Sequence, residues 1–339
     1  MKYARLTEVL GEGKVRCDLC ERRCVIPEGK RGYCNTRVNE GSRLYSLSYG
    51  NIVACESRPI EIKPFFHYWP GSSALTYSSL GCNFPCPWCQ NWHISKTYPS
   101  SSPSSFLSPS LLISRAIENG DHGVCASFGE PTLLHEYNLE VFMRATENGL
   151  YSCYVSNGYM SIEALHELVD AGLSGLNIDV KGSEEVYEKY LNADVRIVWR
   201  NVREALKLGV HVEIVHLIIT GVNDRESELL SVIEQHLRYA GKDVPLHFTR
   251  YFPAYKFNSP PPPLQILENA YKVAKNAGIN YPYLGNVSPH PWENTYCPKC
   301  GRLLIERENY SILRYEVEEN NCCRYCGERI PIYNESNSK

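Results

Sequence analysis

Directly after a predicted β-strand, the chain reads Gly81-Cys82-Asn83-Phe84-Pro85-Cys86-Pro87-Trp88-Cys89-Gln90-Asn91. The cysteines follow the spacing Cys-x3-Cys-x2-Cys, which allows three thiolates to wrap one polynuclear metal cluster. Thiolates normally hold all four irons of a cubane cluster, so three ligands leave one iron open to an exogenous chelator. A structural zinc site needs four ligands, and His93 is the nearby candidate for the fourth. The stretch therefore indicates an iron–sulfur site, with a zinc knuckle as the alternative.

The sequence around this loop alternates predicted strands with predicted helices. The strands are expected at residues 73–80, 124–128, 151–156, 176–180, 211–219, 246–251 and 281–285. The helices are expected at residues 111–119, 139–148, 162–171, 184–208, 226–239 and 264–276, with an interruption near Ala193. Such alternation implies parallel pairing through crossovers. We expect an α/β fold with a partial TIM barrel of about six β/α units, and an open doubly wound sheet as the alternative.

Composition and charge exclude several classes of function. The 339 residues carry 35 Lys+Arg and 38 Asp+Glu, a formal net charge of −3, which gives no general reason to bind nucleic acid or an anionic membrane. The first residues lack the apolar core of a signal peptide, and no apolar run approaches the length of a membrane span. We expect a cytoplasmic protein. In a reducing compartment, its 15 cysteines are better explained by metal ligation than by disulfides.

One cysteine group lies near the N-terminus, in a segment expected to span residues 1–70. Its members are Cys17, Cys20, Cys24 and Cys34. Four thiols suffice for zinc or for an auxiliary iron–sulfur cluster, and the spacing leaves both open. Residues 14–43 hold eight Lys/Arg and four Asp/Glu, a local charge of +4. That charge could contact nucleic acid, but a solvated metal-binding loop is the preferred interpretation.

A second group lies in a C-terminal segment expected to span residues 291–333, after a core of residues 71–290. It comprises two Cys-x2-Cys-Gly knuckles, formed by Cys297 with Cys300 and by Cys323 with Cys326. This spacing is typical of a zinc ribbon, with a second iron–sulfur cluster as the competing interpretation. Cys322 is interpreted as a spare cysteine beside the second knuckle.

Polar side chains follow several predicted strands at the point where each strand ends. Glu130, Asn157, Asp179 and Lys181 hold such positions. Ligands of β/α barrels bind at the carboxyl ends of strands, so these side chains are expected to face one site. The presence of Asn157 at such a position is explained equally well by the preference of turns for asparagine. Turns do not specially favour Glu130 or Lys181.

The three-cysteine loop, with Trp88 just before its last cysteine, resembles the signature of the radical S-adenosylmethionine (radical SAM) superfamily. The resemblance implies a [4Fe-4S] cluster on Cys82, Cys86 and Cys89, with the SAM amine and carboxylate on the open iron. It further implies a low-potential electron donor that drives reductive cleavage of SAM to a 5′-deoxyadenosyl radical. That radical would abstract hydrogen from an unidentified small molecule or protein.

Further positions resemble the pyruvate formate-lyase activating enzyme group. Glu130 matches the acid of the Gly-Gly-Glu motif that contacts the SAM amine, although Phe128 replaces the first glycine here. Asp179 and Lys181 resemble that group's Asp-x-Lys motif. Gly221 resembles a glycine that approaches adenine, and His247 a late-strand histidine near the cofactor. The cofactor-binding positions implied are Trp88, Glu130, Asn157, Asp179, Lys181, Gly221 and His247.

From about Cys17 to Pro331, the arrangement resembles the radical SAM enzyme of the AmmeMemoRadiSam system. The resemblance rests on the N-terminal cysteines, the three-cysteine loop, the terminal ribbon and the segment Pro59-Ile60-Glu61-Ile62-Lys63-Pro64-Phe65-Phe66-His67. It implies Memo-like and AMMECR-type proteins as partners and names no substrate. Glu61, Lys63 and His67 match the family pattern without an implied role.

Three other functions remain as alternatives to this enzyme. An activase would place a radical on a glycine of a partner enzyme. A zinc-ribbon interaction or nucleic-acid-binding module would hold zinc without iron and need no catalytic core. An electron carrier would need neither an open iron nor the charged residues Glu130 and Lys181.

Overall fold

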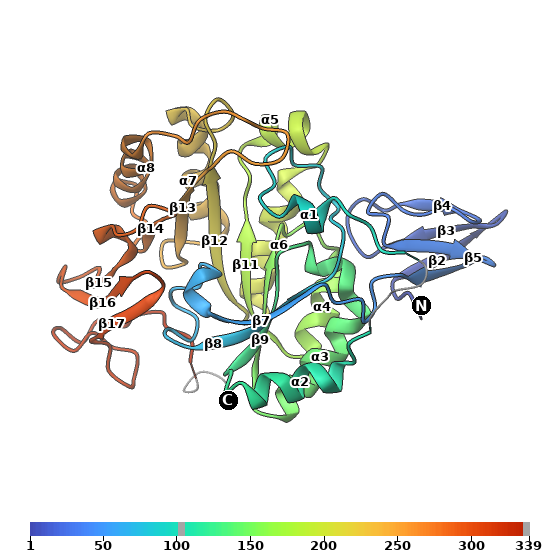
Figure 1. Cartoon of the computed structure of the whole chain (residues 1–339). Helices are drawn as coiled ribbons and strands as arrows, with labels where there is room; N and C mark the ends of the chain where they lie inside the picture. Colours follow the sequence, from blue (N-terminus) through green and yellow to red (C-terminus); the bar gives the residue numbers. More distant parts are fainter. Residues whose placement is uncertain (101–105, 335–339) are drawn as a thin grey trace.

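The computed structural model describes residues 1–100 and 106–334. Its centre is an eight-stranded sheet with the order β14-β13-β12-β11-β10-β9-β8-β7 (Figure 1). Neighbours from β8 to β14 are parallel, and β7 joins the edge antiparallel to β8. The strands are β7 (Ala54–Pro59), β8 (Ser73–Ser78), β9 (Gly123–Ala126), β10 (Tyr151–Ser156), β11 (Leu173–Asp179), β12 (His211–Ile218), β13 (Leu246–Arg250) and β14 (Pro282–Gly285).

A helix lies in each crossover between successive parallel strands of the described chain. These helices are α2 (Pro109–Glu118), α3 (His135–Glu147), α4 (Ile162–Asp170), α6 (Val195–Lys207), α7 (Glu226–Tyr239) and α8 (Leu264–Asn276). The strand order follows the chain order without reversal, whereas a doubly wound sheet requires a reversal. The predicted partial β/α barrel is therefore confirmed, and the doubly wound alternative is excluded.

Local sequence signals explain where several helices begin and end. Ser108 and Ser161 cap α2 and α4, because their side chains accept hydrogen bonds from Leu111 N and Ala164 N. The interruption expected near Ala193 is present. There a short helix α5 (Glu184–Val186) and a π-helical turn η3 (Tyr187–Leu191) end at Asn192, whose φ is +46°. Shorter elements are α1 (Trp92–Ser95), η1 (Ile60–Ile62), η2 (Pro131–Leu134) and η4 (Pro291–Glu293).

The N-terminal residues form two small antiparallel sheets beside the barrel (Figure 1). One contains β2 (Thr7–Gly11), β3 (Lys14–Cys17) and β4 (Val25–Pro27), and the other β1 (Lys2–Tyr3), β6 (Arg43–Ser46) and β5 (Arg37–Glu40). A buried ion pair joins them to the barrel, since Arg37 Nη2 donates to Glu136 Oε1 on α3 at 2.6 Å.

Residues 60–71 leave β7 and pack inside the barrel before β8 begins. Their anchor is Glu213 on β12, which is fully buried and accepts hydrogen bonds from the backbone N–H groups of Phe66 and His67. His211 and His247 also bond to Glu213, at 3.0 and 2.7 Å. We call these five residues the Glu213 network.

The C-terminal residues form a module on the side of the barrel opposite the N-terminal sheets (Figure 1). It contains β15 (Thr295–Tyr296), β16 (Leu303–Glu308) and β17 (Ser311–Tyr315). Its small apolar core is continuous with Phe66, Tyr281 and Tyr283 of the barrel. Arg307 adds a polar link, because its Nη2 donates to Phe66 O at 2.7 Å. Within the described residues, no helix is long and apolar enough to cross a membrane.

Candidate active site

The loop 81–91 leaves β8 and lines a cavity at the carboxyl ends of the barrel strands. Gly81 has a φ of +101°, and a Cβ there would lie 2.6 Å from Thr36 Cγ2, so the turn depends on glycine. The loop is closed by a hydrogen bond from Gly81 N to Ile94 O on α1. The cavity, called here the barrel cavity, encloses about 1310 Å³ including its open mouth.

The three thiols of the loop share one wall of the barrel cavity. Cys86 is buried, and Cys82 and Cys89 are half-buried. Burial raises the pKa of the Cys82 thiol to about 12, with the nearby Glu130 carboxylate adding to the rise. Burial also raises the pKa of Cys86. Bound metal deprotonates such thiols outright, so the donor set fits a metal cluster better than three free thiols.

Glu130 faces this wall from the segment after β9. Its Oε1 accepts hydrogen bonds from Thr132 N, Thr132 Oγ1 and Ser156 Oγ at 3.0, 2.6 and 2.8 Å. Its Oε2 accepts one bond, from Asn157 N at 3.0 Å. Burial raises the pKa of Glu130, and these hydrogen bonds oppose the rise. The carboxylate is therefore fixed in orientation, with lone-pair capacity left on Oε2.

Asp179 and Lys181 reach the barrel cavity from the end of β11. Lys181 Nζ donates to Asp179 Oδ2 at 2.6 Å. Although burial opposes the lysine charge, Asp179 holds the pKa of Lys181 above its ordinary value. The positive charge of Lys181 also acts on Cys86. It partly opposes the rise in pKa that burial causes at this thiol, so the lysine lies near the thiol wall.

Asn157 and Trp88 complete the part of the lining that the sequence predicted. Asn157 Nδ2 donates to Asn83 Oδ1 at 2.7 Å and lies 3.9 Å from Cys82 Sγ. Trp88 is buried, and its ring meets the edges of Tyr190 and Phe257 at centroid distances of 5.3 and 5.9 Å.

Two predicted cofactor residues lie outside this lining. Gly221, in the loop after β12, lines a separate surface pocket together with Asp224 and Arg225. His247 belongs to the Glu213 network, where its Nε2 lies 2.7 Å from Glu213 Oε2. The structure therefore groups Trp88, Glu130, Asn157, Asp179 and Lys181 with the thiols, but not Gly221 or His247.

A family model described as the Radical SAM superfamily matches residues 76–233. The chain belongs to the radical SAM superfamily. An uncharacterized protein of Methanocaldococcus jannaschii is 40% identical over 336 residues, which are 98% of this chain and 99% of that protein. GTP 3',8-cyclase of Nautilia profundicola is 26% identical, over 68% of this chain and 76% of that protein.

Solved structures support the same fold. SuiB of Streptococcus suis, bound to S-adenosylmethionine, superposes with a TM-score of 0.52 at 10% sequence identity. The match covers 68% of this chain and 54% of that chain. At this identity the likeness concerns the fold alone.

Sequence reasoning assigned no role to Lys63, which also lines the cavity of this radical SAM chain. It is 5% exposed, and its Nζ lies 4.0 Å from the ring centroid of Phe128. Burial lowers the pKa of this lysine. Phe128, where the resembling motif has glycine, adopts a φ of +67°. The available signal was its match to the family pattern in residues 59–67, which carried no implied role.

The two flanking cysteine groups differ in geometry. The sulfurs of Cys297, Cys300, Cys323 and Cys326 all lie within 4.8 Å of one another. The distance is 3.5 Å from Cys297 to Cys326 and 3.8 Å from Cys300 to Cys323. Tetrahedral ligation at about 2.3 Å puts sulfurs about 3.8 Å apart, so this group can bind a single metal ion. The N-terminal cysteines line a cavity of their own.

Proposed function

We propose that this protein holds a [4Fe-4S] cluster on Cys82, Cys86 and Cys89 and uses it to cleave SAM reductively. When bound, the reduced cluster and SAM together supply a 5′-deoxyadenosyl radical, which removes a hydrogen atom from a substrate. The observation that carries the proposal is one cavity whose wall of three thiols faces a fixed carboxylate and a buried lysine.

The chain's own residues supply binding and orientation in this proposal. Glu130 Oε2 offers a free lone pair to the amine of SAM. Lys181 offers a permanent positive charge to its carboxylate, and Asp179 holds that lysine in place. Trp88 contributes an apolar surface beside the thiols.

Lys63, Thr249 and Asn286 line other parts of the barrel cavity. We propose that the substrate binds along this remaining lining. Its charged groups are Lys96, whose Nζ donates to Phe84 O, and the buried Lys63. A substrate with an anionic or carbonyl group would complement Lys63.

The test is anaerobic reconstitution followed by addition of SAM and dithionite. We expect 5′-deoxyadenosine from the wild-type protein and none from Cys86→Ala. Cys55→Ala is the matched control, because Cys55 lies on β7 outside the lining of the barrel cavity. Wild-type turnover by Cys86→Ala would refute the assignment.

A further inference from the structure

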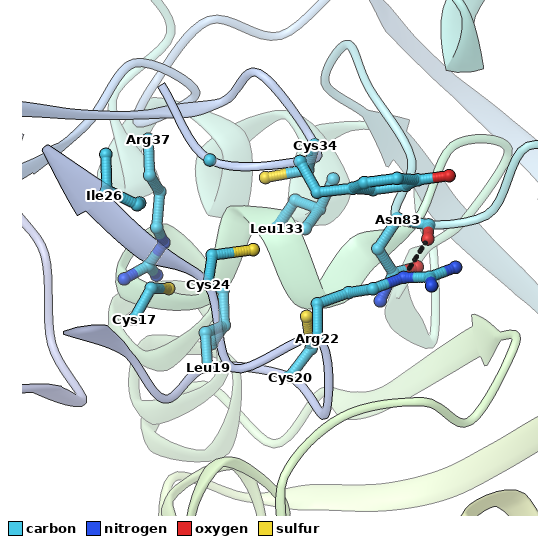
Figure 2. A pocket seen from close by; sticks show the side chains of 12 residues that line it. Cys17, Leu19, Cys20, Arg22, Cys24, Ile26, Cys34, Arg37, Asn83 and Leu133 are labelled. Atoms are coloured by element: carbon cyan, nitrogen blue, oxygen red, sulfur yellow. Dashed lines mark hydrogen bonds between the residues drawn. The ribbon is translucent and has the colours of Figure 1, made fainter. Parts of the chain in front are cut away.

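The four N-terminal thiols line one small cavity that the proposed reaction does not use. Figure 2 shows Cys17, Cys20, Cys24 and Cys34 around it. Cys17 ends β3, Cys20 and Cys24 lie between β3 and β4, and Cys34 lies between β4 and β5. All four are free cysteines, and all but Cys24 are buried. The fold therefore gathers a complete tetrathiol ligand set from β3 and the two connections on either side of β4.

The N-terminal and C-terminal cysteine groups differ in how closely their sulfur atoms lie together. Of the described side chains, only the C-terminal cysteines form a group of three or more whose ligand atoms all lie within 4.8 Å. Among the described residues, neither the N-terminal cysteines nor Cys82, Cys86 and Cys89 form such a compact single-ion group. A single zinc ion pulls four sulfurs together, whereas a cubane cluster binds each thiolate on a different iron and holds the sulfurs farther apart. The N-terminal spacing thus agrees with the loop that matches the iron–sulfur signature.

Hydrogen-bond donors without partners line the same cavity. Arg37 is fully buried, and its Nη1 and Nη2 are bonded to Arg5 O and Glu136, but its Nε–H has no partner. Asn83 Nδ2 is buried and makes no hydrogen bond of normal geometry, although it lies beside the Cys20 thiol. An unpaired buried donor is costly. Sulfides and thiolates of an anionic cluster accept such bonds, so both donors point to a sulfur-rich ligand.

Asn83 connects this cavity to the barrel cavity. It follows Cys82 directly in the chain, and its side chain lies beside Cys20. Its Oδ1 accepts from Asn157 Nδ2, which contacts Cys82 Sγ at 3.9 Å. Arg22 Nε secures the same residue by donating to Asn83 O at 3.0 Å (Figure 2). One residue therefore spans both cysteine sites.

We propose that Cys17, Cys20, Cys24 and Cys34 hold a second iron–sulfur cluster that relays electrons to the cluster on Cys82, Cys86 and Cys89. One electron from an external low-potential donor reduces the N-terminal cluster. The same electron then passes through the Asn83 region to the SAM-binding cluster, and the N-terminal cluster returns to its oxidised form. The relay rests on the proposed function, whereas the second cluster does not.

Metal content tests the second cluster. The reconstituted wild-type protein is expected to hold about eight irons, and Cys20→Ala/Cys34→Ala about four. Cys55→Ala is the control and should match the wild type. A wild-type protein that binds only four irons, with or without zinc at the N-terminal site, overturns the proposal. This wild-type count decides the question even if the double variant fails to fold.

Two reductants test the relay. With a reduced flavodoxin as the donor, SAM cleavage by Cys20→Ala/Cys34→Ala should fall about tenfold or more below the wild type. With dithionite, which is small enough to reduce the remaining cluster directly, the change should stay under about twofold. Equal losses with both reductants, or no loss with either, overturn the relay. A wild-type protein that holds eight irons but never cleaves SAM would refute the proposed function and leave the second cluster standing.

Discussion

Lys181 combines burial, a fixed partner and a place on the thiol wall. Asp179 keeps its charge in place at 2.6 Å, and the pKa of the lysine lies above its ordinary value, so it is positive at any working pH. In the proposed function this buried cation beside the three thiols would bind the carboxylate of SAM, because charge-assisted hydrogen bonds gain strength away from water.

We predict that Lys181→Ala weakens SAM binding about tenfold, since the lost contact is worth about 1.4 kcal/mol. Titration calorimetry on the reconstituted protein measures the change. The matched control is Lys207→Ala, because Lys207 is an exposed lysine on α6. This variant should bind SAM as the wild type does. Unchanged affinity in Lys181→Ala would remove this lysine from the binding site.

The position of residues after strands predicted much of the site. Glu130, Asn157, Asp179 and Lys181 all line the barrel cavity, because the carboxyl ends of parallel strands share one edge of the sheet. Lys63 could not be placed by that reasoning. It comes from residues 60–71, whose path inside the barrel depends on Glu213, a partner almost 150 positions away.

At the scale of elements, the loop after β9 carries backbone strain beside the cavity. Phe128 has a φ of +67°, a region that costs a side-chain-bearing residue about 1–2 kcal/mol. Its ring carries the Lys63 ammonium at 4.0 Å, and such contacts offset about 0.5–2 kcal/mol.

We predict that Phe128→Gly is more stable than Phe128→Ala by about 1 kcal/mol, because both lose the ring but only alanine retains the strain. Urea unfolding measures both variants. Leu111, an exposed residue on α2, is the control position. There the Leu111→Gly variant should be less stable than Leu111→Ala by about 1 kcal/mol. The same order at both positions would mean that strain at Phe128 contributes nothing.

Sequence patterns located the parallel strands but not β7. The parallel strands are buried on both faces and give apolar runs, whereas β7 has three exposed and three half-buried residues and shows no alternation. Its place at the sheet edge comes from pairing with β8, which only the folded chain reveals. The N-terminal strands were missed because they give no apolar run: β2 is exposed throughout, and β3 and β6 alternate over only four residues each.

At the scale of the whole molecule, the Glu213 network joins residues 60–71 to the barrel strands. Burial alone would raise the pKa of Glu213, but the hydrogen bonds from His211 and His247 hold it well below its ordinary value of 4.5. A carboxylate with a depressed folded-state pKa stabilises the fold fully above its unfolded-state pKa. That contribution is lost progressively as the pH falls below about 4.5.

We predict that Glu213→Gln lowers the free energy of unfolding by about 3 kcal/mol at pH 7, because the buried donors lose a charged acceptor. The decline in stability below pH 4.5 should also be shallower than in the wild type, since glutamine does not titrate. Urea unfolding between pH 7 and pH 4 measures both effects. Glu234→Gln, at an exposed position of α7, is the control. Parallel pH curves for wild type and Glu213→Gln would contradict the linkage.

Two contacts of Phe66 can form only late in the synthesis of the chain. Its hydrogen bond to Glu213 spans 147 residues, and the bond that it accepts from Arg307 spans 241. Ribosomes add about 5–20 residues each second, so Phe66 waits roughly 10–50 s for Arg307 to be made. During that interval the thiols at positions 17–34 and 82–89 have already been synthesised, while the barrel around them is still incomplete. The barrel, which depends on both contacts, is therefore complete only after the C-terminal module has been made.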